Sequence, residues 1–154
     1  MIPSNQWIRD LMQNKVRLIE IANACAAAYN EGCGHPEWTE PFGEDKPEMV
    51  AQNLAGPQAV LTGCSIMALT RGVEPDYLPL LRDIVNGDVT ETERGILHRA
   101  ANGTWGAGQS FRTDKGPLGR MTRMNLFDDL DPVEVAKDWA QIQAAAAYLL
   151  QHAS

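Results

Sequence analysis

The sequence predicts a mainly α-helical fold: a compact bundle of about five to six helices, with a glycine-rich loop or short β-ribbon before the last one. Three observations predict it. Apolar residues recur at helical spacing over most of the chain, helix-start and helix-stop residues divide it, and strand signals are few. No repeat or linker interrupts the 154 residues, so we expect residues 1–154 to form one domain that buries a core.

The first predicted helix starts at Ser4, whose hydroxyl is suited to cap it, and runs to about Glu31. Glycines at positions 32 and 34 end it. Residues 32–47 contain three prolines and three glycines, a composition typical of an irregular loop. One helix face carries most of the apolar residues, namely Trp7, Leu11, Leu18, Ile21, Cys25 and Ala28.

The second helical region is predicted to begin at Asp45, as the cap, with Pro47 in the first turn. Gly56-Pro57 should kink or break it before a second part at about 58–71. Apolar spacing over 74–85 then predicts a short helix, followed by a turn at Asn86-Gly87.

Two further helices are predicted in the C-terminal half. Thr90 and Glu93 have the spacing of a capping box, and this helix should end at Asn102-Gly103. Asp131, followed by a proline and by Glu134, predicts the start of a last helix that runs to about residue 151. Its apolar stripe is Trp139, Ile142, Ala146 and Leu149.

Composition excludes several classes of function. The net charge of −7 argues against binding bulk nucleic acid or an anionic membrane. The apolar runs are far too short to span a membrane, and the N-terminus does not resemble a secretory signal. Cys25, Cys33 and Cys64 make an odd count without a disulfide framework, which favours a reducing compartment. We therefore expect a cytoplasmic protein.

Residues 103–123 form the most informative segment, here called the basic segment. It holds five glycines, two aromatic residues, four basic residues and one acid, Asp114, for a net charge of +3 in an acidic chain. Glycine allows close approach of backbone N–H groups, aromatic rings stack on a base, and guanidinium groups pair with phosphate. The segment indicates a site for an anionic ligand, although a basic surface turn is the alternative.

Metal sites are not predicted. Cys33 and His35 lie eight and ten residues after Cys25, but a structural zinc site needs four ligands at short paired spacing, and Cys25 is expected to face the core. Asp128-Asp129 has the chemistry for a hard cation. Its position more readily suits the acidic approach to a helix N-terminus.

Catalytic signals are weak. His98 is near Glu91 and Glu93 in sequence, but a general base needs a pocket and a positioned partner, so a surface or partly buried histidine is the simpler interpretation. Nucleophile-elbow and Walker motifs are lacking, and Phe111 stands where a dinucleotide fingerprint needs glycine. We expect no catalytic residue and no cofactor.

Several features together resemble the ryanodine-receptor-type domain in its small, free-standing bacterial and phage form. A first helix ending in Ala26–Glu31 leads to Pro36-x-Trp38. Later come the turn Asn102-Gly-x-Trp-Gly106, a basic Asp114-Lys115 pair, and Asn125-Leu-Phe-Asp-Asp-Leu130 before the closing helix. The resemblance covers about residues 18–150.

The resemblance implies a helical binding module without catalysis that reads or sequesters a nucleotide-type signal, as in a phage protein directed against an immune messenger. It points to the same ligand-binding residues as the basic segment. Arginine and lysine would bind phosphates and aromatic residues would stack, although the two tryptophans are equally suited to a core. The expected ligand-binding residues are Trp38, Trp105, Phe111, Arg112, Lys115, Arg120 and Arg123.

Two other functions are compatible with the sequence. One is a nucleotide-hydrolysing enzyme that uses His98, or an aspartate from 128–131, as acid or base. The other is a protein-interaction module whose alanine-rich last helix, at Ala144–Ala147, packs a partner closely. A homo-oligomer suits all three.

Overall fold

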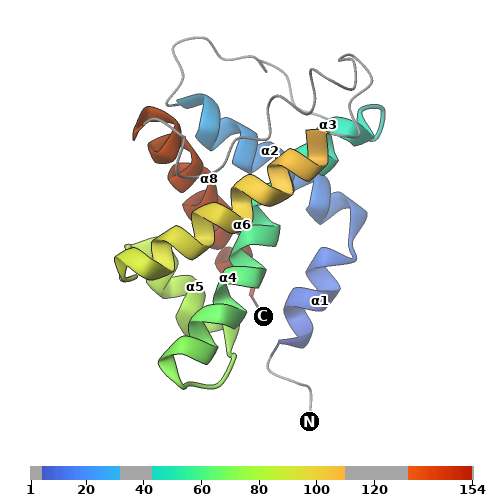
Figure 1. Cartoon of the computed structure of the whole chain (residues 1–154). Helices are drawn as coiled ribbons and strands as arrows, with labels where there is room; N and C mark the ends of the chain where they lie inside the picture. Colours follow the sequence, from blue (N-terminus) through green and yellow to red (C-terminus); the bar gives the residue numbers. More distant parts are fainter. Residues whose placement is uncertain (1–4, 32–42, 110–131, 154) are drawn as a thin grey trace.

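The computed structural model describes residues 5–31, 43–109 and 132–153, and their fold is mainly α-helical as predicted, without a strand among them (Figure 1). Within these residues, no helix has both the length and the apolar character needed to cross a membrane. The elements are α1 (Gln6–Met12), α2 (Lys15–Glu31), α3 (Pro47–Gln52), α4 (Ala55–Arg71), α5 (Tyr77–Asn86), α6 (Glu91–Gln109) and α8 (Pro132–Gln151).

The N-terminal region is two helices and not the single one expected. Gln13 and Asn14 separate α1 from α2, and the Asn14 side chain accepts a hydrogen bond from the backbone N–H of Arg17 at 3.2 Å. An asparagine that caps a new helix in this way competes with continuation of the previous one. Ser4, the predicted cap, lies outside the described residues.

The break between α3 and α4 lies before the predicted Gly56-Pro57. Asn53 and Leu54 separate the helices, and Gly56-Pro57 falls in the first turn of α4, where the missing proline N–H breaks no helical hydrogen bond. The predicted cap of α3 is also wrong, because Lys46 occupies the cap position without a side-chain cap bond. Pro47 is in the first turn, as expected.

The capping box at the start of α6 is confirmed. The backbone N–H of Glu93 donates to Thr90 Oγ1 at 3.1 Å, and the backbone N–H of Thr90 donates to Glu93 Oε1 at 2.8 Å. The predicted end of this helix is wrong, since α6 passes Asn102-Gly103 and ends at Gln109. A glycine weakens a helix by only about 1 kcal/mol, so it does not stop one that neighbouring helices support.

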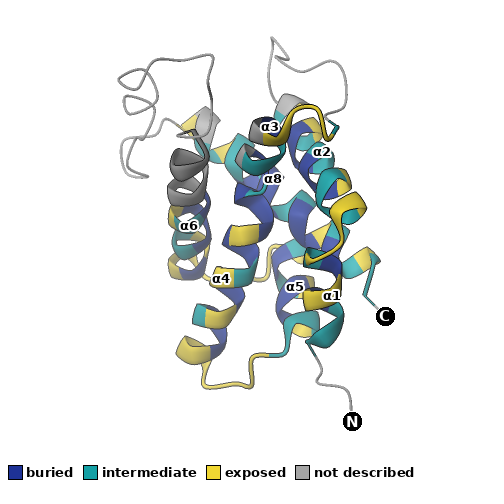
Figure 2. Cartoon of the chain, turned by 90° about the vertical axis from the view of Figure 1, so that its right-hand side faces the viewer, coloured by how far each residue is buried: buried dark blue, intermediate teal, exposed yellow. Residues whose placement is uncertain are grey.

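The core surrounds α4, which packs against α5, α6 and α8, while α2 also packs on α8. Figure 2 shows the buried residues facing inward between these helices. The α8 stripe is confirmed, because Ile142, Ala146 and Leu149 are fully buried and Trp139 is nearly so. The largest buried apolar side chains from the other helices are Ile21, Val60, Met67, Leu81, Ile84 and Leu97.

Four helix termini lie at one end of the bundle. The end of α2, the beginning of α3, the end of α6 and the beginning of α8 all lie at the top of Figure 2. Contacts of α3 with α2 and α6, and of α8 with α2 and α6, join these helices. At this end the Lys137 ammonium of α8 lies 5.5 Å from the centroid of the Tyr29 ring of α2. The helix termini that flank residues 32–42 and 110–131 in the sequence therefore lie at this end.

Candidate functional site

Most of the predicted ligand-binding residues lie outside the described residues: Trp38, Phe111, Arg112, Lys115, Arg120 and Arg123. Trp105 is within α6, so the first third of the basic segment, residues 103–109, has a helical backbone and not the loop or ribbon expected. Cys33, His35 and the aspartates at 128, 129 and 131 also fall outside the described residues.

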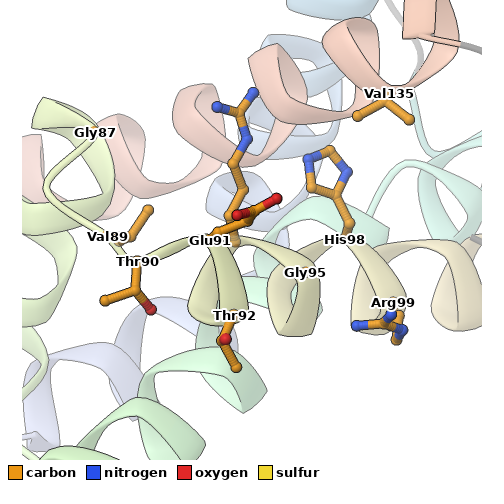
Figure 3. Close-up of a pocket in the computed structure, with 10 residues that line it drawn as sticks. Gly87, Val89, Thr90, Glu91, Thr92, Gly95, His98, Arg99 and Val135 are labelled. Carbon is orange, nitrogen blue, oxygen red and sulfur yellow. The ribbon is translucent and has the colours of Figure 1, made fainter.

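A hollow lies between α6 and the start of α8, and we call it the α6–α8 hollow (Figure 3). Its volume is about 750 Å³, within the usual range for small-molecule sites. Its lining includes Val135 of α8 and, from the segment that leads into and forms the first half of α6, Gly87, Val89, Thr90, Glu91, Thr92, Arg94, Gly95, His98 and Arg99. The hollow thus extends along α6 to within four residues of Gly103, where the basic segment begins.

Three side chains of the hollow share one face of α6. Glu91, Arg94 and His98 are spaced by three and four residues, which places them on neighbouring turns of the same face. In Figure 3 the Glu91 carboxylate and the His98 ring project on the side of α6 toward Val135, whereas Thr92 and Arg99 project on the other side. One face therefore combines an acid, a permanent cation and an imidazole.

The ring of Trp139 in α8 contacts the cation of this face, the Arg94 guanidinium. The guanidinium carbon of Arg94 lies 4.4 Å from the Trp139 ring centroid, a cation–π contact. The His98 ring also stacks on Trp139, with 5.6 Å between centroids and 27° between planes. Trp139 belonged to the predicted core stripe, but its contact with Arg94 was not predicted. The i, i+4 spacing of Arg94 and His98 is the sequence signal that marks this face.

His98 is buried more deeply than predicted. Its side chain is 2% exposed, so the expectation of a surface or partly buried histidine is wrong. Burial, with the nearby Arg94 charge, lowers the pKa of His98 to about 4, so the ring is neutral at pH 7. A neutral, buried imidazole suits packing and hydrogen bonding within the fold.

Glu93, which the sequence placed beside His98, has a different role. Its carboxylate accepts two hydrogen bonds from Arg71, Nε–Oε2 at 2.6 Å and Nη2–Oε1 at 2.9 Å. Arg71 also donates to Asp83 at 2.7 Å. This network joins the ends of α4 and α5 to the start of α6, so the role of the Glu93 carboxylate is to link these helices.

The described cysteines face the core, as expected for Cys25. Cys25 and Cys64 are free thiols whose exposed fractions are 0% and 1%. This burial raises the pKa of each to about 12. The Cys25 thiol donates to the backbone oxygen of Gln141 at 3.9 Å. No group of three or more potential metal ligands occurs within the described ranges.

The alanine-rich part of α8 is only partly available to a partner. Ala145 and Ala146 are fully buried inside the chain, whereas Ala147 is exposed. Close packing at these alanines serves α2 and α4 in the same molecule, both of which pack on α8.

Comparison with known proteins adds no relative: no family model, no curated protein and no solved structure matches the chain.

Proposed function

We propose that this protein binds a phosphorylated, nucleotide-type small molecule without transforming it. The observation that carries the proposal is the +3 charge of the basic segment within a chain of net charge −7. Four cationic side chains next to glycines and aromatic rings suit the phosphates and base of a nucleotide.

The arrangement of the helices supports this proposal. The helix termini that flank residues 32–42 and 110–131 in the sequence lie at one end of the bundle. In this proposal Trp38 and Arg112 contribute to one common ligand site. The resemblance to the ryanodine-receptor-type domain favours the same ligand class and a role in sequestering a signalling nucleotide, as in a phage protein acting in the host cytoplasm.

A thermal-shift screen against cyclic and linear nucleotides and ADP-ribose compounds tests the proposal. A ligand at 100 times its dissociation constant stabilises the folded state by about 2.7 kcal/mol, which raises Tm by several degrees. The ligand recovered after denaturation should be unchanged. New products would favour the enzyme alternative. A screen in which no compound raises the Tm of the folded protein would favour the interaction module.

Size-exclusion chromatography with light scattering determines the oligomeric state.

Two variants test the basic segment directly. Arg112→Glu and Trp105→Ala should each abolish binding while the helical circular-dichroism spectrum is kept. Arg82→Glu is the matched control, since Arg82 is an exposed arginine of α5 that lies outside both segments. Normal binding by both test variants would mean that the basic segment is not the site.

A further inference from the structure

We propose that the α6–α8 hollow binds a phosphorylated pentose, with Arg94 holding the phosphate and Glu91 the sugar hydroxyls. The inference deepens the proposed function, since this group is part of every nucleotide. It rests on described residues alone and does not require the basic segment.

Arg94 has the geometry of an anion-binding group. Its side chain is exposed, and its guanidinium forms no ion pair with a residue in the described ranges. Contact with the Trp139 ring at 4.4 Å restricts the side chain, which lowers the entropy lost when a ligand binds. The stacked face is occupied, but the N–H groups lie around the edge of the guanidinium plane and remain able to donate to phosphate oxygens.

Arg71 shows the contrast within the same region. Its guanidinium donates to Glu93 and Asp83, so its charge is neutralised by the protein. Arg94, one residue after Glu93, lines a hollow of about 750 Å³ instead. The hollow therefore presents a cation whose complement is not supplied by the described chain.

Glu91 sets the chemistry of the rest of the ligand. Glu91 precedes Arg94 by three residues, so the two share one face of α6, and the Glu91 carboxylate is not ion-paired within the described part of the chain. A carboxylate repels an anion, but it accepts hydrogen bonds from hydroxyl groups. A ligand that contacts both groups needs a phosphate near Arg94 and hydroxyls near Glu91, about one helical turn apart. A pentose phosphate has this arrangement, and inorganic phosphate lacks the hydroxyls.

Titration of the full chain with ribose 5-phosphate, inorganic phosphate and ribose tests the inference. Binding is followed by NMR, using the indole N–H of Trp139 and the Nε–H of Arg94. Ribose 5-phosphate should bind about tenfold more tightly than inorganic phosphate, because each hydrogen bond to a charged group contributes enough for roughly that factor. Ribose alone should bind most weakly.

Two substitutions separate the two roles. Arg94→Gln should weaken the binding of both ribose 5-phosphate and inorganic phosphate by about tenfold or more, because the charge that holds the phosphate is lost. Glu91→Gln should remove the preference for ribose 5-phosphate over inorganic phosphate and should not weaken the binding of inorganic phosphate. Both side chains are exposed, so both variants should unfold near the wild-type temperature. Arg82→Gln on α5 is the matched control and should change nothing.

The outcomes also separate this site from the basic segment. If ribose 5-phosphate leaves the Trp139 and Arg94 signals unshifted, or if Arg94→Gln binds it normally, the hollow is not the site. Loss of nucleotide binding in Arg112→Glu alone would then uphold the proposed function and reject this inference. Loss of nucleotide binding in Arg94→Gln, with normal binding by Arg112→Glu, would show that the hollow is the binding site and that the basic segment is not. If AMP binds more tightly than ribose 5-phosphate, the ligand of the hollow is a nucleotide. If the two bind equally, the ligand is a free sugar phosphate.

Discussion

Arg71 and Glu93 form a bidentate ion pair across 22 residues of sequence, with Nε–Oε2 at 2.6 Å and Nη2–Oε1 at 2.9 Å. Glu93 is 5% exposed and is also the acidic member of the capping box. One carboxylate therefore accepts the backbone N–H of Thr90, the residue before α6, and ties α6 to the end of α4. Arg71 extends the link to α5 through Asp83.

Removing the charge of Glu93 should destabilise the fold. Glu93→Gln keeps an acceptor for the Thr90 N–H but leaves the Arg71 guanidinium facing a neutral amide. We expect the free energy of unfolding to fall by about 2–3 kcal/mol, measured by chemical denaturation at pH 7. Glu91→Gln is the matched control on the same turn and should change it by less than about 0.5 kcal/mol. Equal effects would mean that the ion pair contributes nothing specific.

The same contact predicts an acid transition. The Arg71 hydrogen bonds lower the pKa of Glu93 from 4.5 to about 2, so the unfolded state binds a proton more readily than the folded state. Stability from this pair is present above pH 4.5 and is lost as the pH falls toward 2. The difference in unfolding free energy between wild type and Glu93→Gln should shrink over this range. A difference that stays constant down to pH 2 would contradict the prediction.

His98 predicts a second, separate pH dependence. Burial lowers the pKa of His98 from 6.5 to about 4, so protonation favours the unfolded state as the pH falls through this window. Between pH 6.5 and 5 we expect a loss of about 1.5 kcal/mol. His98→Phe keeps a flat ring against Trp139 and should remove this loss. Denaturant titrations of both proteins at the two pH values provide the measurement, and parallel losses would show that other groups are responsible.

Gly63 is predicted to set the spacing of α4 and α6. A Cβ at this position would overlap Leu97 Cδ2 and lie 3.1 Å from Leu97 Cγ. Leu97 is fully buried, so its side chain has little room to move. Gly63→Ala should destabilise by about 1–2 kcal/mol, despite the better helix propensity of alanine.

A double-mutant cycle with Leu97→Val tests the cause of that loss. The smaller side chain relieves the overlap, so the double variant should lose less than the sum of the single losses. Ser65→Ala, at an exposed position of α4, is the control and should cost little. Additive losses would rule out the overlap as the source.

The two described cysteines should resist thiol reagents in the native state. The thiolate is the reactive form, and burial raises the pKa of Cys25 and Cys64 to about 12. In a Cys33→Ser background, Ellman's reagent should label no thiol in native buffer and two in denaturing guanidinium chloride. Rapid native labelling would show that α2 or α4 opens readily.

Elements with local signals were predictable from the sequence. The Thr90–Glu93 capping box and the span of α8, from Pro132 to Gln151, agree with the structure because their hydrogen bonds and apolar spacing involve residues a few positions apart. The turn predicted at Asn86-Gly87 belongs to the same class, since Gly87 ends α5 with φ of 76°.

Boundaries that depend on competition between neighbours were less predictable. Gly56-Pro57 has the composition of a break but lies in the first turn of α4, and Asn102-Gly103 lies inside α6. A glycine inside a helix costs about 1 kcal/mol, which is small beside the packing of a whole helix, and a proline in the first turn breaks no helical hydrogen bond.

The sequence by itself determined the helical class, most of the helix starts and the composition of the basic segment, because these depend on residue type and short spacing. Only the tertiary structure brought Arg71 to Glu93, 22 residues away, and Arg94 to Trp139, 45 residues away. It also buried His98 and opened the α6–α8 hollow beside it. Such contacts depend on how helices pack, and the packing is decided by shape complementarity over the whole core and not by any local pattern.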